Sequence, residues 1–273
     1  MANSAEVPRS GENDTSTLRV APESTTMRAC VVTEEGLVLR SKVKHILAIA
    51  AIAALAATGG AFAVVGGEAD TTHTYVGAAL QHQVQNGVSG NEHCSGFLIS
   101  ETKFVTAAHC FQQNGDLIRI TFAQNSRDPG AQFIEVPASS LVNSHDFDIA
   151  IITLPSQTGV GVATPGTADP KDLLDVVGYG WETLSHKMFT SFGSRQIATT
   201  KTAIAGSLSD VYLKLLADPG VCLGDSGGPA LIHGTNTVVA VNVGSNGNPN
   251  CNGISYSLRL DNPGVQQFIA ANR

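Results

Sequence analysis

Short apolar stretches separated by turn-forming residues run through residues 64–273. The stretches are rich in Val, Ile, Leu and Phe, and most have the length of a single strand. Gly, Pro, Asn and Ser lie between them, where they favour turns. The pattern predicts strands at 95–100, 103–106, 118–122, 148–154, 175–179, 196–204, 211–216, 229–232, 238–243 and 254–260. Many short strands with little helix are typical of β-sandwiches and β-barrels.

The end of the chain follows a helical period instead. Val265, Phe268 and Ile269 lie at the spacing of one helix face, directly after the segment Asn262-Pro263-Gly264. Asparagine before proline is a common way to begin a helix. We therefore expect a short C-terminal helix that packs on the body.

Residues 1–63 are expected to be an N-terminal extension and a signal peptide. Residues 1–39 are polar and aperiodic, so we predict no fold for them. A basic segment at 40–44, an apolar run at 46–57 and Ala61-Phe62-Ala63 follow, which is the layout of a secretory leader cut after Ala63. The alternative is a membrane anchor, because no charge occurs from 46 to 67. Membrane association is expected only if the leader stays uncleaved.

Composition excludes several classes of function. The 273 residues are 42% hydrophobic, which is enough for a core. The formal net charge is -7, and the acidic excess lies in 64–273, because 1–63 holds equal numbers of acidic and basic residues. A nucleic-acid partner would require a basic face, so none is expected. No C-x-x-C or H-E-x-x-H motif occurs, and we expect neither a metal nor a cofactor.

The hexapeptide GDSGGP at 224–229 is the strongest chemical signal. Its glycines permit a turn so sharp that the N–H groups of Gly224 and Ser226 can point at one spot, where an oxyanion would develop. Ser226 is therefore a candidate nucleophile. A serine hydroxyl needs a histidine to take its proton and a carboxylate to orient that histidine.

Both partners are available earlier in the chain. His109 lies in TAAHC at 106–110, after a predicted strand, and Asp148 opens the apolar run DIAII. A carboxylate at the start of a buried strand is costly unless it has a partner, and a histidine would supply one. His145 and Asp146 precede the strand, and we interpret them as solvated loop residues.

Four segments together resemble a known family. VVGG at 64–67, TAAHC at 106–110, DIAI at 148–151 and GDSGGP at 224–229 are similar, in the same order, to the signatures of the chymotrypsin-like (trypsin-fold) serine peptidases. The resemblance covers 64–273 and is to a secreted, bacterial-type member. It implies an all-β fold of two antiparallel six-stranded β-barrels with a short C-terminal helix, divided into 64–160 and 161–273. The active site would lie between the barrels, with His109 and Asp148 from the first and Ser226 from the second.

The resemblance also assigns the cysteines and the new N-terminus. The exported part would hold four cysteines, an even number that favours disulfides but allows three pairings. The family pattern selects Cys94 with Cys110 and Cys222 with Cys251. It further implies that cleavage frees the amine of Val64, which then pairs with Asp225 beside the nucleophile.

The specificity pocket departs from the family pattern. The resemblance places Gly220 at its floor and Gly244 and Gly253 in its walls, and the usual Ser-Trp-Gly segment is replaced by Asn242-Val243-Gly244. Asn242 can still donate a hydrogen bond to Asp148 in place of the serine, but the loss of the Trp changes the channel wall. Trypsin-like members have an aspartate at the floor, so Gly220 predicts a preference for uncharged side chains over Arg or Lys. Asp218 lies two residues from that position, too far to substitute for it.

The function predicted from the sequence is therefore a secreted, extracellular serine endopeptidase that acts on protein or peptide substrates through an acyl-enzyme. We expect a monomer. The alternative is a catalytically silent binding protein on the same fold. A self-processing or esterase-like hydrolase of narrow range is a third possibility.

Overall fold

The computed structural model describes residues 64, 66–85, 88–113, 115–169, 171–184, 188–202, 209–216, 220–246, 251 and 253–273. They belong to one compact unit, Thr58–Arg273. The expected signal peptide, and the membrane anchor that is its alternative, lie outside the described residues. Among the residues that are described, no helix is both long enough and apolar enough to cross a bilayer.

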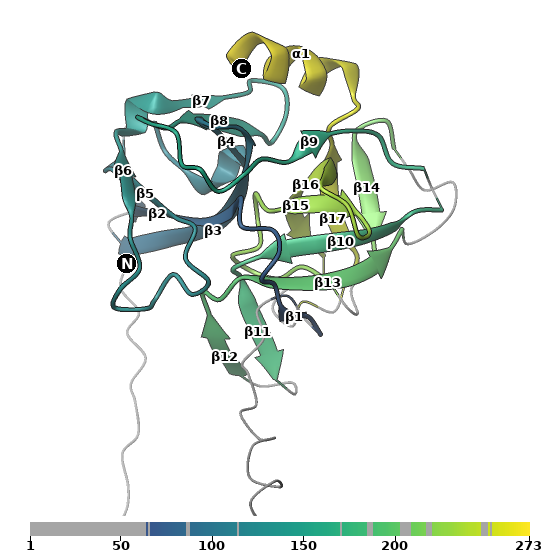
Figure 1. Cartoon of the computed structure of the whole chain (residues 1–273), viewed down its shortest axis with the longest axis horizontal. Coiled ribbons are helices and arrows are strands. Elements are labelled where there is room, and N and C mark those ends of the chain that lie inside the picture. The colour runs from purple at the N-terminus through teal and green to yellow at the C-terminus, as the bar shows by residue number, and fades with distance from the viewer. Residues whose placement is uncertain are drawn as a thin grey trace, which may run out of the picture. The chain divides into compact units, whose positions relative to one another are not determined.

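The first sheet curls around the left half of the body in Figure 1. Its seven strands follow the order β6-β5-β2-β3-β4-β8-β7, and all pairs are antiparallel. Phe104 and Val105 are both fully buried although neighbouring side chains of a strand point to opposite faces, so both faces of β4 are covered. The strands are β2 (Val76–Gln85), β3 (Val88–Ser100), β4 (Lys103–Thr106), β5 (Ile118–Thr121), β6 (Ile134–Val136), β7 (Leu141–Asn143) and β8 (Ala150–Thr153).

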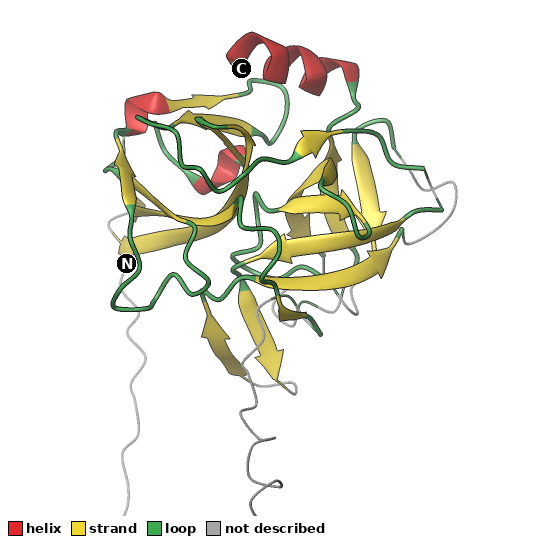
Figure 2. Cartoon of the chain, in the orientation of Figure 1, coloured by secondary structure: helices red, strands yellow, loops and turns green. Residues whose placement is uncertain are grey.

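The second sheet forms the right half of the body and has eight strands. Seven follow the order β1-β13-β10-β15-β16-β17-β14, and β9 adds to β16 in parallel. A separate hairpin, β11–β12, projects from the body (Figure 2). The strands of the sheet and the hairpin are β1 (Glu68–Ala69), β9 (Thr164–Pro165), β10 (Leu173–Gly178), β11 (Trp181–Leu184), β12 (Met188–Phe192), β13 (Gln196–Lys201), β14 (Tyr212–Leu215), β15 (Pro229–Ile232), β16 (Thr237–Ser245) and β17 (Ser255–Arg259).

The predicted fold class is confirmed, but the strand numbers differ from six and six. Strands β1 and β9 have two residues each, which is too short for any hydrophobic period to reveal. Strand β2 was not predicted, for another reason. Val76, Ala78 and Ala79 are all buried, so this segment shows no alternation of apolar and polar positions. Strand β9 pairs with the second sheet just after the expected division between residues 160 and 161.

The helical elements are few. Two short 3-10 turns occur at η1 (Ala108–Cys110) and η2 (Ala138–Ser140), and one α-helix, α1 (Pro263–Asn272), ends the described chain. Asn262 begins α1 as predicted, because its side chain accepts hydrogen bonds from the N–H groups of Gly264 and Val265. Val265 and Ile269 are buried on the inner face of the helix.

The first strand and the last helix of the described residues each pack with the sheet that is more distant in sequence. Strand β1 comes before the first sheet in sequence but pairs with β13 of the second, Glu68 lying opposite Ile197. Helix α1 follows the second sheet but lies beside β7 and β8 of the first (Figure 1). At its first turn, a Cβ on Gly264 would approach the ring of Phe147 to 2.6 Å. Both ends therefore hold the two halves together.

A buried ion pair also fixes the segment after β1 to the second half of the chain. The side chains of Arg195 and Asp70 are only 3% and 1% exposed, and Arg195 Nε lies 3.2 Å from Asp70 Oδ2. Arg195 Nη1 donates to the hydroxyl of Tyr179 (3.2 Å), and Nη2 donates to the side-chain oxygen of Gln124 (3.1 Å). His73 is the second partner of Asp70, at 3.0 Å. The segment after β1 is thus fixed to the end of β10, where Tyr179 lies.

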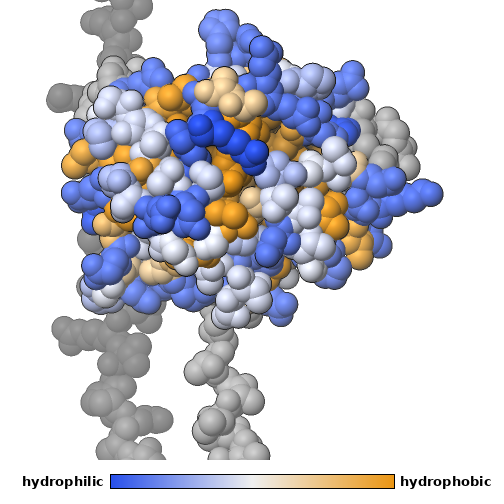
Figure 3. Space-filling model, turned by 45° about the horizontal axis from the view of Figure 1, so that its top comes forward, coloured by the Kyte–Doolittle hydropathy of each residue, from blue (hydrophilic) through white to orange (hydrophobic). Residues whose placement is uncertain are grey.

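The outer surface is mixed in polarity. On the face that Figure 3 shows, apolar residues form patches between hydrophilic ones and do not join into one apolar surface.

Candidate active site

His109 and Asp148 form the ionisable pair of the site. His109 lies in η1 after β4, and Asp148 lies just before β8, the strand that pairs with β4. The distance between His109 Nδ1 and Asp148 Oδ2 is 2.7 Å, and the backbone N–H of His109 donates to Asp148 Oδ1 at 2.9 Å. One carboxylate oxygen therefore holds the imidazole through Nδ1 and the other holds the backbone of His109, so Nε2 is the ring nitrogen that faces away from Asp148.

Two opposing effects set the ionisation of Asp148. Burial raises the pKa of this carboxyl, but the hydrogen bonds and charge of His109 outweigh burial, and the pKa of Asp148 is lowered below its usual range. The carboxylate is therefore charged at neutral pH. A charged Asp148 stabilises the imidazolium that forms when His109 accepts a proton.

Ser226 lies in a turn that only glycine-rich sequence can form. Gly224 and Gly227 have φ angles of 92° and 85°, in the left-handed region where a side chain is strained. The Leu223 carbonyl accepts a hydrogen bond from Trp181 N at 2.7 Å. Because a trans peptide points its N–H opposite to its C=O, this bond directs the N–H of Gly224 away from Trp181.

The two candidate oxyanion donors have no acceptor in the described protein. The N–H groups of the neighbouring Asp225 and Gly227 donate to the carbonyls of Cys222 (3.1 Å) and Asn242 (2.7 Å). Among the described residues, the N–H groups of Gly224 and Ser226 donate to none. They are therefore available to a ligand oxygen.

A cavity of about 230 Å³ adjoins these groups. His109 and Ser226 both line it, which places the two predicted catalytic residues on one hollow. No hydrogen bond joins the Ser226 hydroxyl to His109 in the described structure; such bonds often tighten only when substrate is bound. The full lining is His109, Val221, Cys222, Leu223, Ser226, Asn242, Val243, Gly244, Ser245 and Cys251.

The predicted pocket glycines occupy different places. Gly244 lines the cavity, and a Cβ added there would meet nothing within 4 Å. Gly220 is buried and precedes Val221, which lines the cavity. Gly253 lies two residues after Cys251, which also lines it. Neither glycine is among the described lining residues. Asp218 lies outside the described residues.

The sequence allowed a hydrogen bond from Asn242 to Asp148, but in the structure Asn242 has other partners. Asn242 is fully buried, its amide group lies 3.5 Å from the Pro229 carbonyl, and its side-chain oxygen accepts from the Ser257 hydroxyl at 2.9 Å. A shift in the β16–β17 register begins directly after Asn242. The asparagine therefore joins strands of the second sheet and leaves Asp148 to His109.

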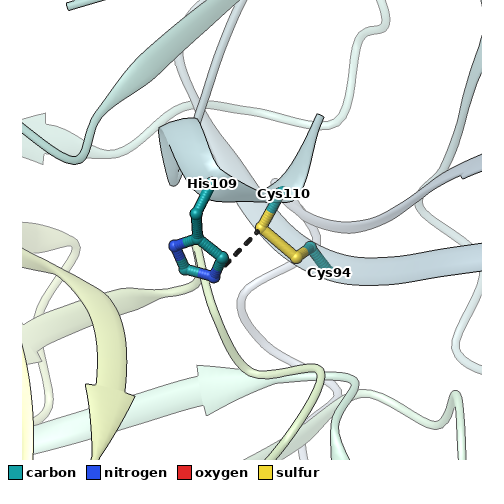
Figure 4. Close-up of side chains that lie close together, drawn as sticks. All are labelled: Cys94, His109 and Cys110. Atoms are coloured by element: carbon teal, nitrogen blue, oxygen red, sulfur yellow. Dashed lines mark hydrogen bonds between the residues drawn. A yellow bond between two sulfur atoms is a disulfide. The ribbon is translucent and has the colours of Figure 1, made fainter. Parts of the chain in front are cut away.

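Both expected disulfides are present. Cys94 and Cys110 join β3 to η1 with a Cα–Cα distance of 6.2 Å, and Cys222 and Cys251 join the two walls of the cavity at 5.2 Å. Figure 4 shows the His109 ring beside the first of these bonds, with Nε2 3.8 Å from Cys110 Sγ. His109, Cys94 and Cys110 lie as close together as metal ligands do. Because both sulfurs are bonded to each other, they are not thiolate ligands.

Asp225 is the most strongly perturbed carboxyl near the site. It is completely buried, and burial raises its pKa to about 7, although it accepts hydrogen bonds from the N–H groups of Cys222 and Gly180, both at 2.8 Å. Val64 is also fully buried, in an apolar cluster of the second sheet that includes Val221. The resemblance pairs this carboxylate with the amine of Val64.

Three other described histidines have environments that distinguish them from His109. His145 pairs with Asp146 at 2.8 Å, and their side chains are 98% and 75% exposed, as expected for loop residues. His233 pairs with Asp175 on the second sheet. His93 lies near Gly224, and burial lowers its pKa to about 4, so it is neutral at pH 7.

The fold and the site together define a class. Two curled, mostly antiparallel sheets, with a serine and a histidine on one cavity and an aspartate against the histidine, are the arrangement of chymotrypsin-like serine peptidases. The family model described as Trypsin matches residues 64–262. The chain belongs to this family.

Solved structures agree with the fold. The structure titled GrC matches with a TM-score of 0.56 and 18% identity over 76% of this chain and 97% of that chain. HL collagenase gives 0.57 and 17%, over 77% and 98%, and an inactivated protease paralogue of the scabies mite gives 0.57 and 18%, over 76% and 99%. A search of curated protein sequences found no match. At these identities the likeness concerns the fold.

Proposed function

We propose that the chain is a serine endopeptidase that cleaves peptide bonds through an acyl-enzyme. The observation that carries this proposal is the cavity that His109 and Ser226 share, with Asp148 held against the far side of the imidazole. Serine, histidine and aspartate in these relative positions are suited to nucleophilic attack on a carbonyl.

Each group has a defined task. The Ser226 oxygen attacks the substrate carbonyl carbon while His109 Nε2 takes the hydroxyl proton. Asp148 accepts the hydrogen bond from Nδ1–H and stabilises the imidazolium. The tetrahedral oxyanion accepts hydrogen bonds from the N–H groups of Gly224 and Ser226. His109 then gives its proton to the leaving amine. Water next attacks the acyl-enzyme carbonyl while His109 takes its proton, and His109 returns that proton to Ser226 as the acid is released.

The cavity favours an uncharged substrate side chain. Val221, Leu223, Val243 and the Cys222–Cys251 bond supply apolar surface, and His109 is the one ionisable side chain among the described lining residues. A buried Arg or Lys would find no carboxylate there, and an unpaired buried charge is costly. We therefore propose a medium to large apolar residue on the acyl side of the scissile bond.

Activation is proposed to follow from cleavage after Ala63. The buried Val64 side chain already packs in an apolar cluster with residues of the second sheet, and the new ammonium would supply the cation for Asp225. Two disulfides fit an oxidising compartment, so we propose export to the cell exterior. Because the body is acidic, we propose a protein or peptide substrate and no nucleic-acid partner. We also propose that the chain is a monomer.

Substitution of the nucleophile tests the proposal. The expressed chain is treated with a fluorophosphonate and, separately, with a peptide library. We expect labelling at Ser226 and peptide cleavage, and a loss of both in Ser226→Ala, because removal of a triad member lowers turnover by several orders of magnitude. A folded wild-type chain that is neither labelled nor active would support the binding-protein alternative. A labelled chain that cleaves esters but no peptide would support the narrow hydrolase.

A further inference from the structure

Ser95 places a buried hydroxyl behind the oxyanion loop. It follows Cys94 on β3 of the first sheet, and it is completely buried. Its Oγ lies 2.9 Å from the N atom of Tyr179 and 2.8 Å from the carbonyl oxygen of Gly224, both of which belong to the second half of the chain. One hydroxyl therefore contacts two separate segments that border the site.

The direction of both hydrogen bonds is fixed by chemistry. An amide nitrogen only donates, and a carbonyl oxygen only accepts. Ser95 Oγ must accept from Tyr179 and give its single hydrogen to Gly224. The same side chain cannot turn to another acceptor without leaving the partly buried Gly224 carbonyl without this donor.

This contact completes the restraint of Gly224. The peptide before Gly224 is held by Trp181 N on the Leu223 carbonyl (2.7 Å), and the peptide after it is held by the Ser95 hydroxyl. With a φ of 92° and no Cβ, Gly224 has more ways to rotate than other residues. The bond from Trp181 directs the Gly224 N–H itself, while the Ser95 hydroxyl and the bond from Asp225 N to the Cys222 carbonyl (3.1 Å) fix the following peptide and so limit rotation about Gly224.

Ser95 also reaches the nucleophile through its main chain. Its N–H donates to the carbonyl of Ser226 at 2.8 Å. This second bond does not depend on the side chain and survives any substitution of Ser95 except proline. Removing the hydroxyl therefore releases the Gly224 carbonyl and loosens one side of Gly224, while Ser226 stays attached to β3.

We propose that Ser95 is a positioning residue for catalysis, whose hydroxyl holds the Gly224 peptide in the orientation that stabilises the oxyanion. This inference rests on the proposed peptidase function. It differs from a purely structural role, because the predicted loss concerns the transition state and not substrate binding or folding.

Ser95→Ala is the direct test, and Thr200→Val is its matched control. Thr200 is also a buried hydroxyl, 3% exposed, and donates to the Leu216 carbonyl at 3.1 Å in the second sheet. Full-length chains are produced in the same way. Rates are expressed per site labelled by a slow fluorophosphonate, so that a poorly folding variant is still measured on its competent fraction.

The expected result is a loss of kcat with an unchanged KM. We expect kcat of Ser95→Ala to fall by about tenfold to a hundredfold, less than the roughly 10²–10³-fold that removal of an oxyanion donor itself costs. A peptidyl trifluoromethyl ketone, whose adduct places an oxyanion in the same site, should bind more weakly by the same factor as kcat/KM falls. Thr200→Val should retain the wild-type kcat.

Two results would overturn the inference. One is a kcat of Ser95→Ala within about twofold of wild type per labelled site. The other is a rise in KM at constant kcat, which would assign Ser95 to ground-state binding. Failure of the proposed function is a different result, namely a wild-type chain without labelling or cleavage.

Discussion

The buried carboxyl of Asp225 predicts that the stability of the chain depends on whether it has been cut before Val64. In the uncut chain, burial raises the pKa of Asp225 from 3.8 to about 7. The folded form then binds the proton more tightly than the unfolded form. Between about pH 4 and pH 7, the free energy of unfolding therefore falls as the pH rises, since ionisation penalises only the folded chain.

The size of the effect follows from the change in pKa. Each tenfold change in an acid dissociation constant corresponds to about 1.4 kcal/mol. A pKa of about 7 in place of 3.8 thus costs the uncut folded chain about 4 kcal/mol at pH 8, and little below pH 4. A free Val64 ammonium paired with the carboxylate would lower the pKa of Asp225 and remove this pH dependence.

Urea unfolding at several pH values measures the difference. The uncut chain, with Ser226→Ala to prevent self-cleavage, is compared with the chain that begins at Val64, and each is compared with its Asp225→Asn variant. The variants are needed because His93, whose pKa burial lowers to about 4, changes stability in the opposite sense over part of this range. Only the part of the slope that Asp225→Asn removes is attributed to Asp225.

Equal slopes in the two forms would refute the reasoning. They would mean that the Val64 amine does not reach Asp225, or that the carboxyl is ionised in both forms. In the cut form, activity should also decline in alkali as the amine loses its proton, because an α-amino group has an ordinary pKa of about 8 and the pair raises it. N-terminal sequencing identifies the form, and full activity in a chain that begins at Phe62 or earlier would contradict the activation proposal.

Two further predictions concern the pocket and the buried ion pair. Among p-nitroanilide peptides that differ only at the residue before the scissile bond, Leu, Phe or Tyr should give the highest kcat/KM; a maximum with Arg or Lys would show that a carboxylate reaches the cavity. Asp70→Asn should lower the free energy of unfolding by about 3–5 kcal/mol, because it leaves the buried Arg195 guanidinium without a charged partner. Thermal and urea unfolding measure this loss, and a change below about 1 kcal/mol would show that the ion pair contributes little.

Local sequence patterns predicted the elements that are determined by neighbouring residues, such as short apolar strands and a capped helix. Strands β4 and β15 agree with their predicted bounds, because each is a short apolar run that ends at turn residues. Helix α1 was predictable from its cap and period. The His109, Asp148 and Ser226 assignment came from motifs, and it remains a prediction about chemistry that the shared cavity supports.

Contacts between distant segments could not be predicted in this way. Ser95 and Gly224 are 129 residues apart, and nothing in the sequence around Ser95 indicates that its hydroxyl reaches the oxyanion loop. Asn242 illustrates the same limit, since the motif suggested a partner in the first sheet whereas the register of β16 with β17 gave it Ser257. Side-chain direction within a sheet depends on irregularities that a pattern of apolar residues does not contain.

The exchange of chain ends between the two sheets has a consequence for limited proteolysis. A protease that cut the link between the sheets, for example in the exposed segment around Ser156 and Gln157, would leave β1 on the second sheet and α1 beside the first. The N-terminal fragment would then hold one strand of the second sheet, and the C-terminal fragment would hold the helix that packs on the first. The two fragments would therefore remain associated without a covalent bond between them. Halves of this chain expressed as separate polypeptides should therefore assemble better when the break lies in this link than when either terminal segment is removed.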